Sequence, residues 1–290
     1  MKYLSLILIV LFASSSCCAT KHIKEDAQKK VIQVENPKTP EPPKVVETII
    51  ETPTPVTKEV VEVEETRPES IVEKPQEVFD HSAWNNLLQK YVSNEGKVNY
   101  KGFKTDYATL KKYIKSLSEN TPTENWTKVE KLAYWINAYN ALTVDLILRN
   151  YPVKSIKDID KPWEQRLWKL GKKWYNLEDI EHQILRKMHE PRIHFAIVCA
   201  SYSCPRLQNE AFTASKLEAQ LTNATKGFLA DSKRNNISAN SIKISKIFSW
   251  FAKDFKQNGS LIDFLNKYSE ITISQNARKS YKDYNWNLNE

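Results

Sequence analysis

Apolar residues recur at helical spacing through most of residues 79–290. In segments 81–91 and 104–117 they fall on one face, which predicts amphipathic helices covering a core. Segment 128–150 is apolar on nearly every side, which predicts a buried helix that ends before Pro152. Further helices are predicted at 176–187, with Asn176 as the cap, and at 213–231, 247–255 and 261–268.

Strand patterns are fewer and shorter. Residues 167–175 predict two short strands around a turn at Gly171, and 242–244 predict another strand. Residues 192–199 form a short apolar and β-branched run between Pro191 and a serine-rich loop, which predicts the central strand. The pattern therefore predicts a single α+β domain, mostly helical, around a small β-sheet.

The amino terminus has the three parts of a secretory signal. Lys2 precedes an apolar run at 4–12 that is too short to span a membrane, and small residues follow it. Cleavage before Cys17 would leave its thiol for diacylglyceryl attachment, as in bacterial lipoproteins. Ser14 departs from the bulky aliphatic residue that such signals prefer, and simple cleavage after Ala19 is the alternative. We expect a signal peptide at 1–16, lipidation at Cys17, and a domain held outside the cytoplasm in the bacterial cell envelope.

Residues 17–78 differ in composition from the remainder. From 20 to 78 there is no aromatic residue and no glycine, and eight of the chain's 13 prolines lie there. Such a segment, rich in Pro, Glu and Lys, cannot bury enough apolar surface to offset the loss of chain entropy. The composition predicts a disordered tether between the membrane and a globular domain at 79–290.

The whole chain has a net charge of +8, and the predicted domain alone carries +11, because the tether is slightly acidic. Lysines are spread along nearly every segment of the domain and form no nucleic-acid motif. Attraction to anionic lipid or glycan is one interpretation, but dispersed charge more simply favours solubility. We expect a membrane contact through the lipid anchor, a cell-wall or peptide ligand, and no nucleic acid; the oligomeric state stays open.

The stretch 194–205 holds both cysteines of the predicted domain. Cys199 falls near the end of the predicted strand and Cys204 in the following loop, where reaction sites gather. The pair has three interpretations: a disulfide, one thiolate nucleophile served by His182 or His81, or two ordinary buried cysteines. Strict strand alternation would place His194 and Cys199 on opposite faces.

Glu181 lies close to the apolar stripe of its predicted helix, with His182 next to it. A carboxylate pressed toward a core keeps its proton more readily and can act as an acid or base. The alternative is an ion pair with Arg186, Arg192 or Arg206.

Asn137 and Asn140 lie three residues apart on the predicted buried helix. Buried amides need hydrogen-bond partners, so they either anchor neighbouring loops or line a cleft. The candidate catalytic residues are Cys199, Cys204, Glu181 and His182, and the candidate binding residues are Asn137, Asn140, His194, Ser203 and Arg206. No standard metal-ligand spacing joins the cysteines to the histidines, so we expect no metal and no cofactor.

Several blocks of this chain match a known family in order and spacing. They are Tyr134-Trp-Ile-Asn-Ala-Tyr-Asn-Ala141, Tyr151-Pro-Val-Lys-Ser-Ile156, Asp179-Ile-Glu-His182 and the stretch 194–205, with flanking blocks at 79–84, 245–251 and 284–286. The chain resembles the bacterial lipoprotein-type members of the domain of unknown function 547 family. The resemblance implies one domain over 79–290 and brings no activity with it.

Two function classes follow. The first is a ligand-binding or interaction module with a cleft near the loop 199–206. The second is a thiol-dependent hydrolase or acyl transferase acting on peptide or cell-wall material. Papain-like and transglutaminase-like enzymes also have a helix followed by strands, but their nucleophilic cysteine starts that helix, and no cysteine lies in the predicted helix 128–150.

Lipidation at Cys17 is testable by detergent partition of the protein from bacterial cells. We expect the chain and a Cys18→Ser control to enter the detergent phase, and Cys17→Ser to remain in the aqueous phase, because the acyl chains would be lost. A Cys17→Ser variant that still enters the detergent phase would refute the prediction.

Overall fold

The structure is a computed structural model and describes residues 79–290. The predicted signal peptide, the lipidation at Cys17 and the tether at 17–78 lie outside the described residues. Among the residues described, no helix has the length and apolar character needed to cross a membrane.

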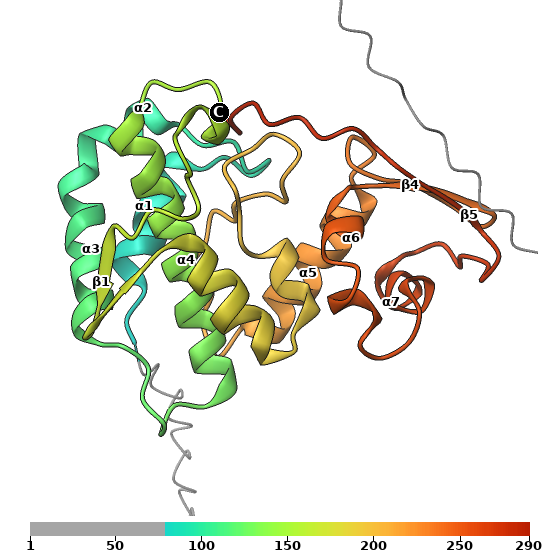
Figure 1. Ribbon diagram of the computed structural model, residues 1–290, viewed down its shortest axis with the longest axis horizontal. Coiled ribbons are helices and arrows are strands. Elements are labelled where there is room, and N and C mark those ends of the chain that lie inside the picture. The colour runs from blue at the N-terminus through green and yellow to red at the C-terminus, as the bar shows by residue number, and fades with distance from the viewer. Residues whose placement is uncertain (1–78) are drawn as a thin grey trace, which may run out of the picture. The chain divides into compact units, whose positions relative to one another are not determined.

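Four helices form the first part of the described chain (Figure 1). They are α1 (Ser82–Tyr91), α2 (Tyr100–Phe103), α3 (Tyr107–Glu119) and α4 (Lys128–Asn150). Helix α4 starts with a capping box between Thr127 and Glu130, and every residue from 132 to 148 is buried. The prediction of a buried helix at 128–150 is confirmed, and the helical stretch predicted at 104–117 is α3 preceded by a 3-10 turn.

The strands form two small sheets. Strands β1 (Trp168–Leu170) and β2 (Lys173–Tyr175) make a hairpin whose turn places Gly171 at φ +60°, a conformation that suits glycine. The second sheet has the order β3 (Asn236–Ser238), β4 (Ser241–Ile244) and β5 (Arg278–Tyr281), antiparallel and then parallel. The predicted α+β class is confirmed, with two separate small sheets instead of one central sheet.

The predicted central strand at 192–199 is wrong. Residues Pro191–Phe195 form a 3-10 helix, and the chain then continues without regular structure to the cysteines. The amide of Asn140 supplies the hydrogen bonds that a neighbouring strand would have supplied: Nδ2 donates to the Ala196 carbonyl at 2.9 Å, and Oδ1 accepts from Val198 N at 3.0 Å. The segment is apolar because it is buried, not because it is extended.

The remaining helices form where they were predicted, but their bounds and helix types differ from the prediction. Asn176 accepts a hydrogen bond from Asp179 N, as predicted, but the helix that follows is a π-helix, η3 (Asp179–Leu185), and then a 3-10 turn. Helix α5 is Leu217–Ala230. The stretch 247–255 divides into α6 (Ile247–Trp250) and a 3-10 turn, and α7 is Leu261–Tyr268.

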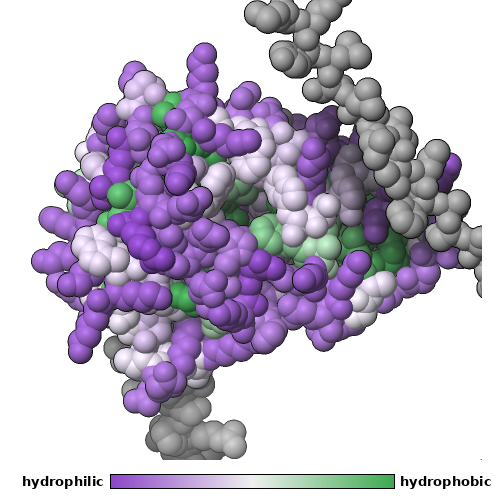
Figure 2. Space-filling view, in the orientation of Figure 1, coloured by the Kyte–Doolittle hydropathy of each residue, from purple (hydrophilic) through white to green (hydrophobic). Residues whose placement is uncertain are grey.

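Two apolar cores meet at the segment 193–198. The first core includes α1 to α4 and the hairpin, and the second includes α5, α6, α7 and β4. Ile193 and Ala196 pack in the first core, whereas Phe195 packs in the second. In Figure 2 apolar side chains gather in the middle of the view, between α4 and α6, and the surface over α3 is mostly hydrophilic. The segment that carries the candidate chemistry therefore runs along the seam between the cores.

The anchoring role of Asn140 can be measured by urea unfolding. Asn140→Ala leaves two buried backbone groups without partners, so we expect the free energy of unfolding to fall by about 2 to 5 kcal/mol. The control is Asn150→Ala on the same helix: its exposed amide bonds only Leu146 O, and we expect a change within about 0.5 kcal/mol. Equal losses in both variants would contradict the anchoring role.

Candidate functional site

A pocket of about 190 Å³ opens at the seam between the two cores. Helix α4, the π-helix η3, the segment 194–205, helix α6 and the carboxyl-terminal segment all contribute to it. The residues that line it are Tyr139, Trp163, Glu181, His182, His194, Ile197, Val198, Cys199, Cys204, Pro205, Ile247, Trp250, Phe251, Tyr284 and Trp286.

Five of the nine candidate residues meet in this pocket: Glu181, His182, His194, Cys199 and Cys204. His194 and Cys199 both line it, which the alternation of a strand would have prevented. The expected separation of these two side chains is therefore wrong, because the segment between them is not extended.

The other four candidates lie elsewhere and hold the surrounding chain. Asn137 exchanges two hydrogen bonds with the backbone of Phe212, and Asn140 holds the segment 196–198. Ser203 Oγ accepts from Asn285 N at 2.9 Å, and Arg206 donates to the Asn94 carbonyl at 3.3 Å. These contacts correspond to the loop-anchor interpretation of the asparagines.

The two cysteines are free thiols in contact. Their Sγ atoms lie 3.2 Å apart, and Cys199 N lies 3.0 Å from Cys204 Sγ. Hydrogen bonds from the Cys204 thiol, Ser201 Oγ and the Tyr284 hydroxyl lower the pKa of Cys199 to about 7, against the effect of burial. Burial raises the pKa of Cys204 well above its ordinary value. Near neutral pH, Cys199 is thus the thiol that ionises.

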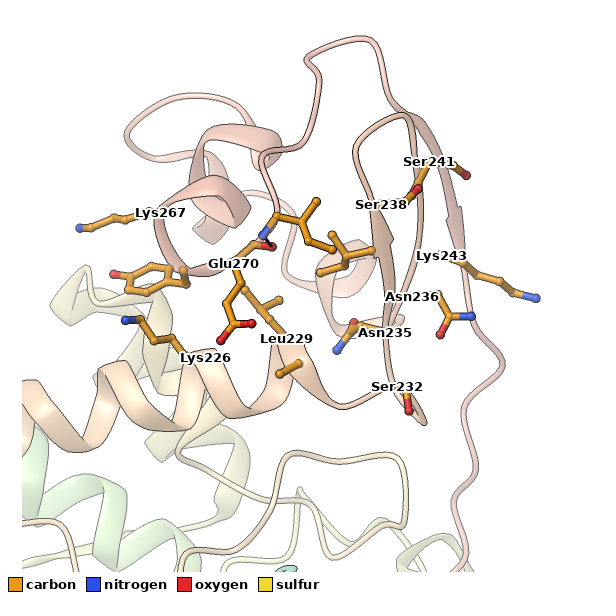
Figure 3. Close-up of a pocket in the computed structure, with 15 residues that line it drawn as sticks. Lys226, Leu229, Ser232, Asn235, Asn236, Ser238, Ser241, Lys243, Lys267 and Glu270 are labelled. Atoms are coloured by element: carbon orange, nitrogen blue, oxygen red, sulfur yellow. Dashed lines mark hydrogen bonds between the residues drawn. The ribbon is translucent and has the colours of Figure 1, made fainter.

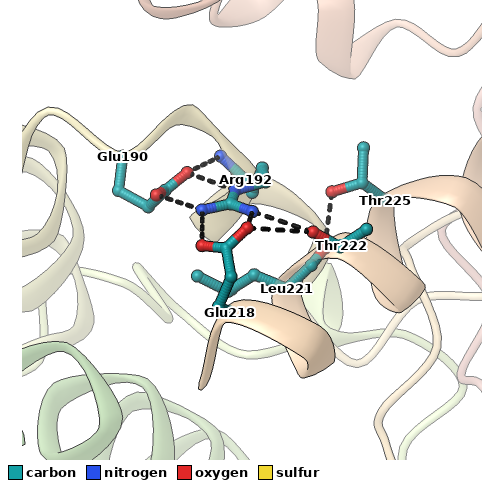
Figure 4. Close-up of polar contacts among 6 residues, drawn as sticks. All are labelled: Glu190, Arg192, Glu218, Leu221, Thr222 and Thr225. Atoms are coloured by element: carbon teal, nitrogen blue, oxygen red, sulfur yellow. Dashed lines mark hydrogen bonds and ion pairs between the residues drawn. The ribbon is translucent and has the colours of Figure 1, made fainter. Parts of the chain in front are cut away.

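Glu181 is buried and accepts a hydrogen bond from the Tyr139 hydroxyl at 3.0 Å. Burial raises the pKa of Glu181, and the nearby His182 opposes this only in part. None of the arginines considered as ion-pair partners forms a salt bridge with Glu181 among the described residues. Figure 4 shows Arg192 bonded to Glu190 and Glu218 instead.

A charged network lies behind the histidines. Arg186 makes a bidentate pair with Asp254 at 2.6 and 2.9 Å and reaches His182 Nδ1 at 2.7 Å, while His194 Nε2 lies 2.8 Å from Asp254 Oδ2. Burial disfavours the ionised form of Asp254, but its bonds to His194 and Arg186 hold its pKa well below the usual range. Burial also lowers the pKa of His194. A neutral imidazole meets a carboxylate only as a donor, so Nε2 carries the proton.

Aromatic side chains form one wall of the pocket, and none of them was among the residues predicted from the sequence for the site. The Trp250 ring stacks on Trp286 at a centroid distance of 5.8 Å and contacts the tilted ring of Tyr284 at 4.8 Å. Trp286 meets Trp163 edge to face at 5.9 Å. Phe251 stacks on His194 at 3.9 Å. Four of these five residues lie in the blocks 245–251 and 284–286, which carry the family resemblance. These blocks were the signal in the sequence that could have identified the aromatic wall.

A larger hollow of about 870 Å³ lies between α5, the second sheet and the end of α7. Its lysines do not converge: Figure 3 shows Lys243 and Lys267 pointing outward on opposite sides. No cysteine or histidine lines it. The pocket of about 190 Å³, which both cysteines and two histidines line, is therefore the candidate site.

Other partners for the thiols are distant or lacking in residues 79–290. His81, considered as a base, bonds Tyr113 in the first core and does not line the pocket. No cluster of three or more metal-ligating side chains occurs in this part of the chain. The described hydrogen-bond partners of Cys199 Sγ are a thiol and two hydroxyls, and no histidine or carboxylate of residues 79–290 is hydrogen-bonded to it.

The burial of Glu181 predicts a pH dependence of stability. The folded chain holds the Glu181 proton more tightly than the unfolded chain, so the contribution is complete below the ordinary pKa of 4.5 and is lost as pH rises through the raised pKa. Glu181→Gln removes this loss. We expect its free energy of unfolding, relative to the unsubstituted protein, to increase by about 1 kcal/mol or more between pH 4 and pH 7.

Urea unfolding at several pH values measures this difference. Glu124→Gln, at an exposed position, is the control and should show a constant difference. Parallel pH curves for Glu181→Gln and the unsubstituted protein would contradict the raised pKa.

Comparison with known proteins gives one match. Residues 123–229 match the family described as "Protein of unknown function, DUF547", a span that includes α4, η3 and both cysteines but stops before α6. No curated protein and no solved structure matches the chain significantly. The family resemblance predicted from the sequence is thus confirmed for residues 123–229, which are similar to the DUF547 family.

Proposed function

We propose that the pocket between the two cores binds a small ligand with one flat ring, and that the domain is a ligand-binding module. The observation that supports this most is that Trp163, Trp250 and Trp286 line the same pocket as the polar side chains of Glu181, Cys199 and Cys204, here called its floor. Ligand sites commonly combine apolar and aromatic walls with a few polar groups that orient the ligand. Trp250 is 47% exposed although it belongs to this wall, which leaves one side of its ring available to a ligand.

The size of the pocket agrees with one ring. At about 190 Å³ it is larger than the cavity of about 150 Å³ that takes up benzene in a protein core, so it has room for one ring. Aromatic faces pack against flat apolar surfaces, which an aromatic residue and the carbon face of a sugar both present.

The floor favours a neutral polar substituent. Glu181 keeps its proton to a higher pH than usual and can then donate a hydrogen bond, while an ionised ligand carboxylate would face the Cys199 thiolate. A peptide aromatic residue or an N-acetylated cell-wall sugar would meet both requirements. A lipid anchor at Cys17 would hold the pocket near such material in the cell envelope.

Thiol-dependent hydrolysis is the rival function. The lowered pKa of Cys199 favours it. It also requires a base close to the thiol, and the described partners of Cys199 do not supply one. Ligand binding needs no such base, and so we place it first.

Titration with two single-ring probes tests the proposal. N-acetylphenylalanine amide and N-acetylglucosamine are added to the protein while tryptophan fluorescence is recorded. We expect at least one probe to change the fluorescence saturably, and Trp250→Ala to weaken that binding at least tenfold, because one aromatic wall is removed.

Trp174→Ala is the matched control. Trp174 is 52% exposed, lies on β2 and does not line the pocket, so binding should persist in this variant. Binding that survives Trp250→Ala, or no binding of either probe, would refute the proposed site. Hydrolysis of a phenylalanine ester that disappears in Cys199→Ser would favour the rival function over this one.

A further inference from the structure

The two thiols at the floor of the pocket are positioned for a reaction with each other. Their Sγ atoms are 3.2 Å apart, and a disulfide bond needs about 2.05 Å, so an approach of little more than 1 Å would join them. No other cysteine lies in the described residues.

The chain between the cysteines is held in the shape that brings them together. Ala200 has φ +54°, which reverses the direction of the backbone directly after Cys199. Cys204 N donates to the Ser201 carbonyl at 3.1 Å. The carboxyl-terminal segment adds bonds to this loop, with Tyr202 N donating to the Asn287 carbonyl at 2.6 Å and Asn289 N to the Ala200 carbonyl at 3.2 Å. The contact between the sulfurs is thus imposed by the surrounding fold.

The two sulfurs differ in access and in acidity. Cys199 is half-buried, whereas only 4% of Cys204 is exposed. The pKa of Cys199 is lowered to about 7 and that of Cys204 is raised. In thiol–disulfide exchange the accessible thiolate attacks first, and a thiol with a pKa near the ambient pH is the best attacking group.

We propose that Cys199 and Cys204 form a redox-active pair that exchanges with a disulfide of a small molecule or peptide, with Cys199 attacking and Cys204 resolving. The Cys199 thiolate attacks one sulfur of the external disulfide, and the other sulfur leaves as a thiolate that takes a proton from water. Cys204 then attacks Cys199 Sγ and breaks the mixed disulfide, and the Cys204 proton passes to the departing external sulfur, which leaves as a thiol. The protein pair loses two electrons and the external disulfide gains them.

This activity goes beyond ligand binding and does not require a ring in the pocket. Ser201 Oγ lies 3.1 Å from Cys199 Sγ, and the Tyr284 hydroxyl of the carboxyl-terminal segment lies 3.3 Å from it. In the proposed reaction these hydroxyls stabilise the attacking thiolate. A nucleophile for hydrolysis would instead need a base, as described above.

Equilibration with oxidised and reduced glutathione tests the pair. The full chain is used with Cys17→Ser and Cys18→Ser, so that only the pair can react. After acid quenching, N-ethylmaleimide labelling and trypsin, both cysteines lie in one peptide, residues 193–206. We expect two adducts under reducing conditions, none under oxidising conditions, and a peptide lighter by two hydrogens.

Serine variants separate the two roles. In Cys204→Ser a mixed disulfide with glutathione should accumulate on Cys199. In Cys199→Ser the buried Cys204 should react at least tenfold more slowly. Circular dichroism checks folding, and the unsubstituted pair still decides the question if a variant unfolds. Glutathione adducts without a bridge, or equal rates in both variants, would overturn the proposal. A bridged pair without binding of the ring probes would support this proposal and refute only the binding function.

Discussion

The structure depends on the buried amides of α4, which hydrogen-bond a neighbouring segment that belongs to no sheet. Asn140 bonds the backbone of Ala196 and Val198, and Asn137 bonds both the N–H and the carbonyl of Phe212. A buried backbone without partners would cost about 1 to 3 kcal/mol for each unpaired group. The asparagine amides remove that cost, and the segment 196–198 therefore does not need to form a strand to pair its backbone. For this reason His194 and Cys199 can face the same pocket.

The pocket lies where the two apolar cores meet. The buried polar groups of the seam satisfy one another: Asp254 in the second part of the chain bonds Arg186 and His194. Removing one member of such a network would leave a buried charge without its partner. The free energy lost in this way is larger than the net stabilisation that the intact pair provides. The network therefore fixes the position of one core relative to the other at the place where the histidines line the pocket.

The floor and the wall of the pocket come from different parts of the chain. Tyr139, Glu181 and the two cysteines belong to the segment that matches the DUF547 family, whereas Trp250, Tyr284 and Trp286 lie beyond it. Tyr284 connects them, because its hydroxyl contacts Cys199 while its ring contacts that of Trp250. One side chain thus touches both the aromatic wall and the thiols of the pocket.

Periodicity in the sequence was enough to predict α1, α4 and α7, and Gly171 was enough to predict the hairpin, because these features depend on residues a few positions apart. The gathering of chemically competent residues in 181–204 was also visible in the sequence. Tertiary structure alone decided that 192–199 is not a strand, since a buried segment and a strand have the same composition and Asn140 is more than fifty positions away. It also decided which sulfur ionises and which aromatic rings enclose the site, because both depend on packing between segments that are distant in the chain.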